Sequence, residues 1–221
     1  MSKNTKLKMW CFFNMDISNI IIIIILILIL ILYFFQFKYL SKNNNDRVIL
    51  QKNNPDKELI EDMIENKSPT IFTGMVEQWE VKNDKHITKE EFDINTKIFN
   101  IPLCVSKKYK QLTLPEDKTT DIVKVKSNRN ILFLLEGEIR LILFSPKEEE
   151  DGKNLPKNNF FEEPDKFKDI NYLEIKFSEG HIIYIPKGWS YCYRVEYYTE
   201  LLNMTTESVF SFPYFIFFFL V

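Results

Sequence analysis

An unbroken apolar run from Ile20 to Phe35, built almost entirely from Ile and Leu, constrains the chain more than any other feature. About 20 apolar residues cross the hydrocarbon core of a bilayer as one helix, because a helix satisfies every backbone polar group internally. Ile17 and Phe37 extend the run on either side. The sequence therefore predicts a transmembrane helix over residues 17–37, with the lipid bilayer as the partner of Ile20–Phe35. A buried core helix is the alternative, although the run has no polar face to turn toward water.

The residues that flank the run favour a retained anchor over a cleaved signal peptide. A signal peptide has an apolar region of about 7 to 15 residues followed by small residues at the cleavage site. Here the bulky segment Tyr33–Phe37 follows instead. Lysines and arginines lie on both sides of the run, so the positive-inside rule leaves the orientation open. We expect a single-pass membrane protein of undetermined orientation.

The composition excludes several functional classes. The chain has 221 residues, and its 29 Lys and Arg against 31 Asp and Glu give a net charge of -2, so it lacks the basic excess of nucleic-acid-binding proteins. The chain has only two histidines, and this small number restricts the metal and acid–base chemistry it can perform. The three cysteines are too few and too scattered for a disulfide framework or a zinc ribbon.

The sequence predicts five segments. Residues 1–16 form a short tail, 17–37 the membrane helix, 38–55 an Asn- and Lys-rich polar linker, and 56–210 the folded domain. A Phe-rich apolar tail occupies 211–221 and is too short to span a membrane as a helix. Burial on the domain, insertion at the lipid interface and contact with an unknown protein partner all remain open for this tail.

Two short helices precede many short strands in the predicted domain. Leu59–Ile64 shows helical spacing of apolar residues, and Thr88 with Glu91 has the pattern of a capping box. Alternation begins near Ile101, and we expect a hairpin at Glu136-Gly137, a long charged loop over 147–171 that includes an acidic run at 148–151, and four further strands between 172 and 210. This order favours a mainly β sandwich or barrel with a helical cap.

The segment Glu179–Tyr191 resembles the signature of the cupin-like, JmjC-like oxygenase-related family. That signature has an apolar strand, then Ile-Pro, a turn residue, and Gly-Trp; here the turn is marked by Gly180, Pro186, Gly188 and Trp189. Asn130–Pro146 looks like the family's Asn-Leu strand, Gly turn and Leu-x-x-Pro ending, and Pro69–Gly74 looks like its entry strand. The resemblance implies a double-stranded β-helix, which is a jelly-roll barrel open at one end.

Active members of that family hold Fe(II) with a His-x-Asp/Glu pair and a distant His, and they use 2-oxoglutarate. At the positions that the resemblance assigns to these ligands this chain has Lys124, Lys126 and Tyr191. An ammonium group has no lone pair and repels a divalent cation, so we expect no metal, no cofactor and no catalytic residue.

The same positions suggest other contacts. Two lysines two residues apart on a strand share a face, so Lys124 and Lys126, with Arg140 and Asn130, are candidate anion or ligand contacts, although both lysines pointing to solvent is an equal alternative. Tyr191 and Tyr193 share a strand face and are expected to fill part of the barrel mouth. His181 replaces the family's usual Asp and is interpreted as structural.

The leading hypothesis is a single-pass membrane protein whose degenerate cupin-like domain serves as a binding or structural module. The alternative is a divergent membrane-bound Fe(II)- and 2-oxoglutarate-dependent oxygenase, of hydroxylase or demethylase type. A third hypothesis is an assembly component that makes its contact through the Phe-rich tail.

Overall fold

The structure is a computed structural model and describes residues 17–41, 47–79, 87–101, 104–150, 155–156 and 159–208. The chain divides into two compact units, Met1–Lys42 and Asn43–Val221. In the first unit, α1 (Ile17–Ser41) carries the apolar run, and the large side chains from Ile20 to Leu32 are exposed. Within the part of the chain that the structure describes, no helix qualifies as long and apolar enough to cross a membrane.

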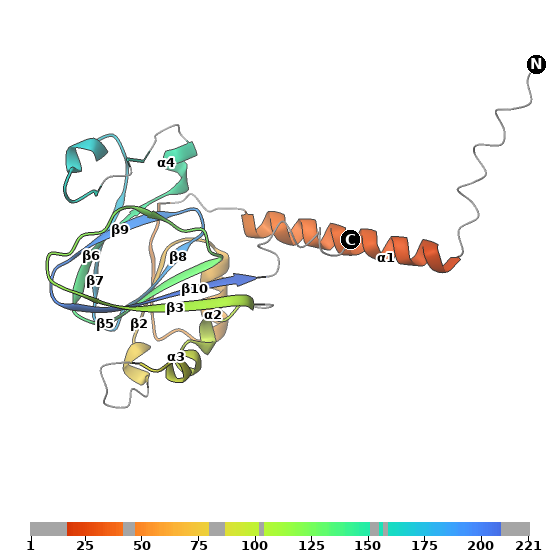
Figure 1. Ribbon diagram of the computed structural model, residues 1–221, viewed down its shortest axis with the longest axis horizontal. Coiled ribbons are helices and arrows are strands. Elements are labelled where there is room, and N and C mark those ends of the chain that lie inside the picture. The colour runs from red at the N-terminus through yellow and green to blue at the C-terminus, as the bar shows by residue number, and fades with distance from the viewer. Residues whose placement is uncertain are drawn as a thin grey trace, which may run out of the picture. The chain divides into compact units, whose positions relative to one another are not determined.

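The second unit is built from two facing sheets (Figure 1). The larger sheet has the strand order β1-β2-β8-β5-β10-β3, and the smaller has the order β4-β9-β6-β7. The strands are β1 (Leu50–Asn53), β2 (Thr70–Thr73), β3 (Cys104–Leu114), β4 (Val123–Lys124), β5 (Arg129–Glu136), β6 (Glu138–Phe144), β7 (Leu173–Ser178), β8 (Ile182–Pro186), β9 (Ser190–Val195) and β10 (Thr199–Ser208). Consecutive strands alternate between the sheets from β4 to β6 and from β7 to β10, as in a jelly roll.

Apolar residues of the two inner faces form the central core. They come from alternate positions of the strands, as the period of two requires. Leu132 and Leu134 of the larger sheet pack against Leu141 and Leu143 of the smaller one, and Trp189 is fully buried among them. The alternation predicted for residues 131–144 therefore places one face of each strand in this core.

The outer face of the larger sheet is covered by the N-terminal helices. α2 (Lys57–Glu65) begins at Asp56, whose side chain accepts a hydrogen bond from the Leu59 amide, and it buries Ile60, Met63 and Ile64. α3 (Lys89–Asn95) begins with the predicted capping box, because the Thr88 hydroxyl and the Glu91 carboxylate both pair with backbone amides. The 3-10 turns Val76–Gln78 and Lys97–Phe99 complete this layer.

The hairpin expected at Glu136-Gly137 is wrong, because β5 and β6 lie in different sheets. β5 pairs with β8 and β10, whereas β6 pairs with β7 and β9. Gly137 has φ +91, and a Cβ there would meet the Tyr198 carbonyl oxygen at 2.3 Å. The chain therefore crosses from one sheet to the other through a residue that tolerates no side chain.

Part of the segment expected to be a loop covers the smaller sheet. α4 (Pro146–Glu150) is followed by the 3-10 helix Pro164–Phe167, and Phe160 and Phe167 pack on Phe144 and Cys192. Glu148, expected on a solvated acidic run, is fully buried. It pairs with Arg47 and accepts hydrogen bonds from the Asn171 amide and side chain, so its charge is compensated.

Candidate functional site

The inner face of the larger sheet changes from apolar to polar along β5 and β10. Leu201 lies opposite Leu134, Asn203 lies opposite Leu132, and Thr205 lies opposite Asn130. Because alternate residues share a face, these positions continue the core-facing rows of Leu132 and Leu134. One end of the barrel is therefore lined by amides and a hydroxyl instead of leucines.

Tyr191 of β9 contacts this polar end from the opposite sheet. Its side chain is 6% exposed, and its hydroxyl accepts a hydrogen bond from Asn203 Nδ2 at 3.5 Å. Burial raises the pKa of Tyr191, whereas hydrogen bonding with the side chains of Asn130 and Asn203 lowers it by less. The phenol is therefore neutral at physiological pH and serves as a hydrogen-bonding group.

Two polar atoms of this cluster have no hydrogen-bond partner within 3.5 Å among the described residues, although the Asn130 side chain is close enough to Tyr191 to lower its pKa. They are Nδ2 of Asn130, a side chain in a residue that is 3% exposed, and Oδ1 of Asn203. Burying an unpaired donor or acceptor costs about 1–3 kcal/mol, so such groups are uncommon unless a ligand or water pairs with them. Asn130, Asn203 and Tyr191 are named the amide–phenol cluster below.

The segment beside Tyr191 carries one valine that is 48% exposed, Val123, and one that is buried, Val125. Val123 lies opposite Tyr191 in the register, and Val125 belongs to the central core. Lys124 lies opposite Ser190 instead, and both Lys124 and Lys126 are exposed. The two predicted lysines are therefore not brought together with Asn130 in the amide–phenol cluster.

The residues at this end do not fit the iron site of the family that the sequence resembles. Valines offer no lone pair, and the amide–phenol cluster supplies neutral oxygen and nitrogen atoms where imidazole and carboxylate ligands are needed. No group of three His, Cys, Asp or Glu side chains suited to a metal ion occurs within the described residues.

His181 lies at the opposite end of β8 from the amide–phenol cluster. It precedes Ile182, whereas Asn130 lies opposite Ile185, and three to four strand residues span roughly 10 to 13 Å. The Nδ1 atom of His181 accepts a hydrogen bond from the Ser178 amide at 3.4 Å, and burial lowers its pKa. These contacts agree with a structural residue in the turn between β7 and β8.

The signature turn forms part of the domain core. Gly180 and Gly188 have positive φ angles, and Pro186 ends β8. The Gly188 amide donates to the Val125 carbonyl, and the Val125 amide donates to the Trp189 carbonyl, at 2.9 and 2.8 Å. The turn therefore joins the strand that carries Val123 to the strand that carries Tyr191.

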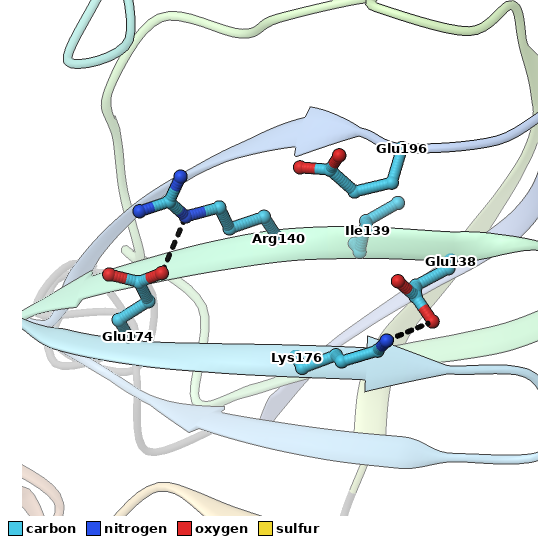
Figure 2. Close-up of a pocket in the computed structure, with 6 residues that line it drawn as sticks. All are labelled: Glu138, Ile139, Arg140, Glu174, Lys176 and Glu196. Atoms are coloured by element: carbon cyan, nitrogen blue, oxygen red, sulfur yellow. Dashed lines mark hydrogen bonds and ion pairs between the residues drawn. The ribbon is translucent and has the colours of Figure 1, made fainter.

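Arg140 lies on the other side of the smaller sheet, outside the barrel. Ile139 and Leu141 point into the core, so Arg140 points outward and is separated from the amide–phenol cluster. It lines a surface hollow of about 270 Å³. There its Nε donates to Glu174 at 2.5 Å, and Lys176 pairs with Glu138 at 3.0 Å (Figure 2). The hydrogen bond to Glu174 is the main cause that raises the pKa of Arg140.

Asn203 is a site residue that the sequence did not predict. The alternation of Leu201, Asn203 and Thr205 was the available clue, since it places an amide in a core-facing row. Only the pairing of β10 with β5 shows that this amide lies beside Tyr191.

No protein-family model and no curated protein sequence matches the chain. Many solved structures are similar to it at low levels, among them the following three. The salicylate 1,2-dioxygenase from Pseudoaminobacter salicylatoxidans has 9% identity and a TM-score of 0.30, over 45% of this chain and 19% of that one. The Drosophila melanogaster CENP-C cupin domain has 10% identity and a TM-score of 0.32, over 45% and 59%. A cupin superfamily protein from Desulfitobacterium hafniense has 7% identity and a TM-score of 0.30, over 46% and 68%.

The chain spans about a fifth of the dioxygenase and about three fifths of the CENP-C domain. TM-scores this low do not support a fold assignment, which therefore depends on the strand order of this chain. The two-sheet, mainly β architecture and its alternating connections are what fit a jelly roll.

Proposed function

We propose that this protein is a membrane-anchored, cupin-like binding module that works without iron chemistry. The observation that carries the proposal is the amide–phenol cluster, in which a buried donor and a buried acceptor lack partners among the described residues. Folding gains nothing from leaving such atoms unpaired, whereas binding a ligand would pair them.

The ligand that fits the cluster carries both an acceptor and a donor. Asn130 Nδ2 needs an acceptor, and Asn203 Oδ1 needs a donor. The neutral Tyr191 hydroxyl beside them adds no charge. A small amide or an amide side chain of a partner protein meets both needs.

The membrane anchor is the second part of the proposal. The exposed, apolar side chains from Ile20 to Leu32 support contact with lipid. The protein would then reside at a membrane with a single segment in the bilayer. The Phe-rich tail, 211–221, lies outside the described residues, and its contact with a protein partner stays a prediction.

Metal binding and turnover test the first part. The full chain in detergent is titrated with Fe(II) without oxygen and then assayed for succinate release from 2-oxoglutarate. We expect no stoichiometric iron and no succinate. One iron per chain together with turnover would establish the divergent oxygenase instead.

A designed variant would serve as the positive control for the iron assay. Val123→His, Val125→Asp and Tyr191→His together place a His-x-Asp pair and a distant His on the two neighbouring strands. We expect this triple variant to bind Fe(II) more tightly than the natural chain.

A ligand screen tests the amide–phenol cluster directly. Small primary amides are added to the full chain, and the thermal midpoint is measured. A compound that stabilises the natural chain is expected to have a reduced effect on Asn130→Leu and an unchanged effect on Lys126→Ala, which alters an exposed residue outside the cluster. Equal stabilisation of all three proteins would contradict binding at the cluster.

A further inference from the structure

The two sheets end in four edge strands, and these differ in how well they are protected against pairing. β1 and β3 are the edges of the larger sheet, and β4 and β7 are those of the smaller one. Edge strands expose unpaired backbone groups, and proteins protect them by keeping them short or by adding lysines. β1 and β4 have only four and two residues, and β3 carries Lys107, Lys108 and Lys110.

β7 has less of both kinds of protection, because it is longer than β1 and β4 and carries one lysine against the three of β3. It has six residues, contains no proline, and pairs with β6 in a continuous register from Leu173 to Ser178. Among the described strands it pairs with β6 alone. Its outer face carries one acidic and one basic residue, Glu174 and Lys176 (Figure 2).

These two charges are complementary to a second copy of the same strand. An antiparallel pairing about a twofold axis at Ile175 places Glu174 opposite Lys176 of the second copy, twice, and leaves Leu173 opposite Phe177 on the inner face. Moving the axis by one residue toward the N-terminus places Glu174 opposite Glu174 of the second copy. Moving it by one residue toward the C-terminus places Lys176 opposite Lys176 of the second copy. Only the central register combines opposite charges with the longest overlap.

A row of cations on the smaller sheet ends at the same edge. Lys176 lies opposite Arg140, and Arg140 lies opposite Arg194. Like charges directly opposite each other on neighbouring strands are destabilising. The carboxylates of Glu138, Glu174 and Asp117 reach these cations diagonally. In the paired form, Glu174 of the second copy would occupy the next position in the row, directly opposite Lys176.

We propose that β7 is a homodimerisation edge, through which two copies of this chain join their four-stranded sheets into one continuous sheet. The interface is isologous, since each copy presents the same strand and the same two charges. It is separate from the amide–phenol cluster, which lies inside the barrel.

Paired charge reversals test this edge with the full chain in detergent. Glu174→Lys gives a chain with two lysines on this face, and Lys176→Glu gives a chain with two glutamates. Each variant alone is expected to dimerise about tenfold more weakly than the natural chain, because both cross-copy contacts become repulsive. An equimolar mixture of the two is expected to form mixed dimers, since every contact then joins a lysine to a glutamate.

Differently labelled chains and energy transfer between them measure these associations. Glu163→Lys and Lys166→Glu reverse a similar exposed ion pair away from the edge, and their self-association should match that of the natural chain. Equal thermal midpoints for all variants confirm that the fold is retained. A monomeric natural chain, dimerisation that survives both β7 reversals, or a mixture no more dimeric than its components would each overturn the proposal.

Discussion

At the scale of single residues, Arg129 ties the helical layer to the larger sheet. Its guanidinium donates to both carboxylate oxygens of Glu61 on α2, at 3.2 and 2.6 Å. It also donates to the backbone carbonyls of Phe99 and Asn100, at 2.9 and 3.3 Å. One buried side chain therefore satisfies acceptors from two covering segments.

Arg129→Ala should lower the free energy of unfolding by about 3 kcal/mol, because it leaves a carboxylate and buried carbonyls without their donor. Arg129→Lys should restore only part of this, since an ammonium cannot reproduce the two-pronged contact. Urea denaturation measures the free energy of unfolding of both variants. Lys166→Ala removes an exposed ion pair and should change the value by at most about 0.5 kcal/mol. A similarly small loss for Arg129→Ala would show that these contacts contribute little.

Asn130 is expected to show the opposite behaviour. The Nδ2 atom of Asn130 lacks a hydrogen-bond partner within 3.5 Å among the described residues, so replacing this side chain by an apolar one of similar size removes a desolvation cost. Asn130→Leu should therefore be neutral or should stabilise the domain by about 1 kcal/mol. Denaturation of the ligand-free chain provides the measurement. A loss of 2 kcal/mol or more would mean that the Asn130 side chain already has its partners, and the binding proposal would lose its main support.

At the scale of elements, β9 concentrates buried groups that ionise only at high pH. Burial raises the pKa of Cys192 and of Tyr193 to about 12 each. The unfolded chain releases these protons at lower pH than the folded one, so the free energy of unfolding falls as pH rises from about 9 toward 12. Below about pH 9 these groups leave stability unchanged.

We expect a loss of about 4 kcal/mol between pH 8 and pH 11, since each unit of pKa difference is worth about 1.4 kcal/mol and the two groups together contribute about three units by pH 11. Denaturant titrations at several pH values measure this. Tyr193→Phe should have a shallower pH dependence above pH 10 than the natural chain. Tyr197→Phe, which alters an exposed phenol just beyond β9, should keep the natural slope. Identical slopes for both variants would contradict the role of burial at Tyr193.

At the scale of the whole molecule, the chain is organised as two compact units joined near residue 42. If α1 is a membrane anchor, the full chain should float with lipid vesicles and resist extraction by alkaline carbonate. A chain without residues 1–42 should stay in the aqueous phase. Its free energy of unfolding should match that of the full chain within about 0.5 kcal/mol, because the core clusters contain no residue of α1. A full chain that carbonate extracts from vesicles would contradict the anchor.

Local sequence patterns predicted those helices and strands whose apolar residues are buried and whose polar residues are exposed or capping. The capping box at Thr88 and the strands over 131–144 and 172–208 followed from side-chain chemistry and the period of two. β3 was recognised only near its start, because its lysines obscure the alternation that an edge strand still obeys. β1 lies within the segment predicted as a linker, since four mostly exposed residues carry little hydrophobic pattern.

The sequence by itself determined the apolar helix and the core-facing rows, because these depend on residue types and short spacings. Tertiary structure decided which rows meet. It placed β5 and β6 in different sheets, buried Glu148 against Arg47, and brought Asn203 to Tyr191. Such contacts join residues far apart in the chain, and their partners are fixed by strand pairing and the packing of two sheets, which no local pattern encodes.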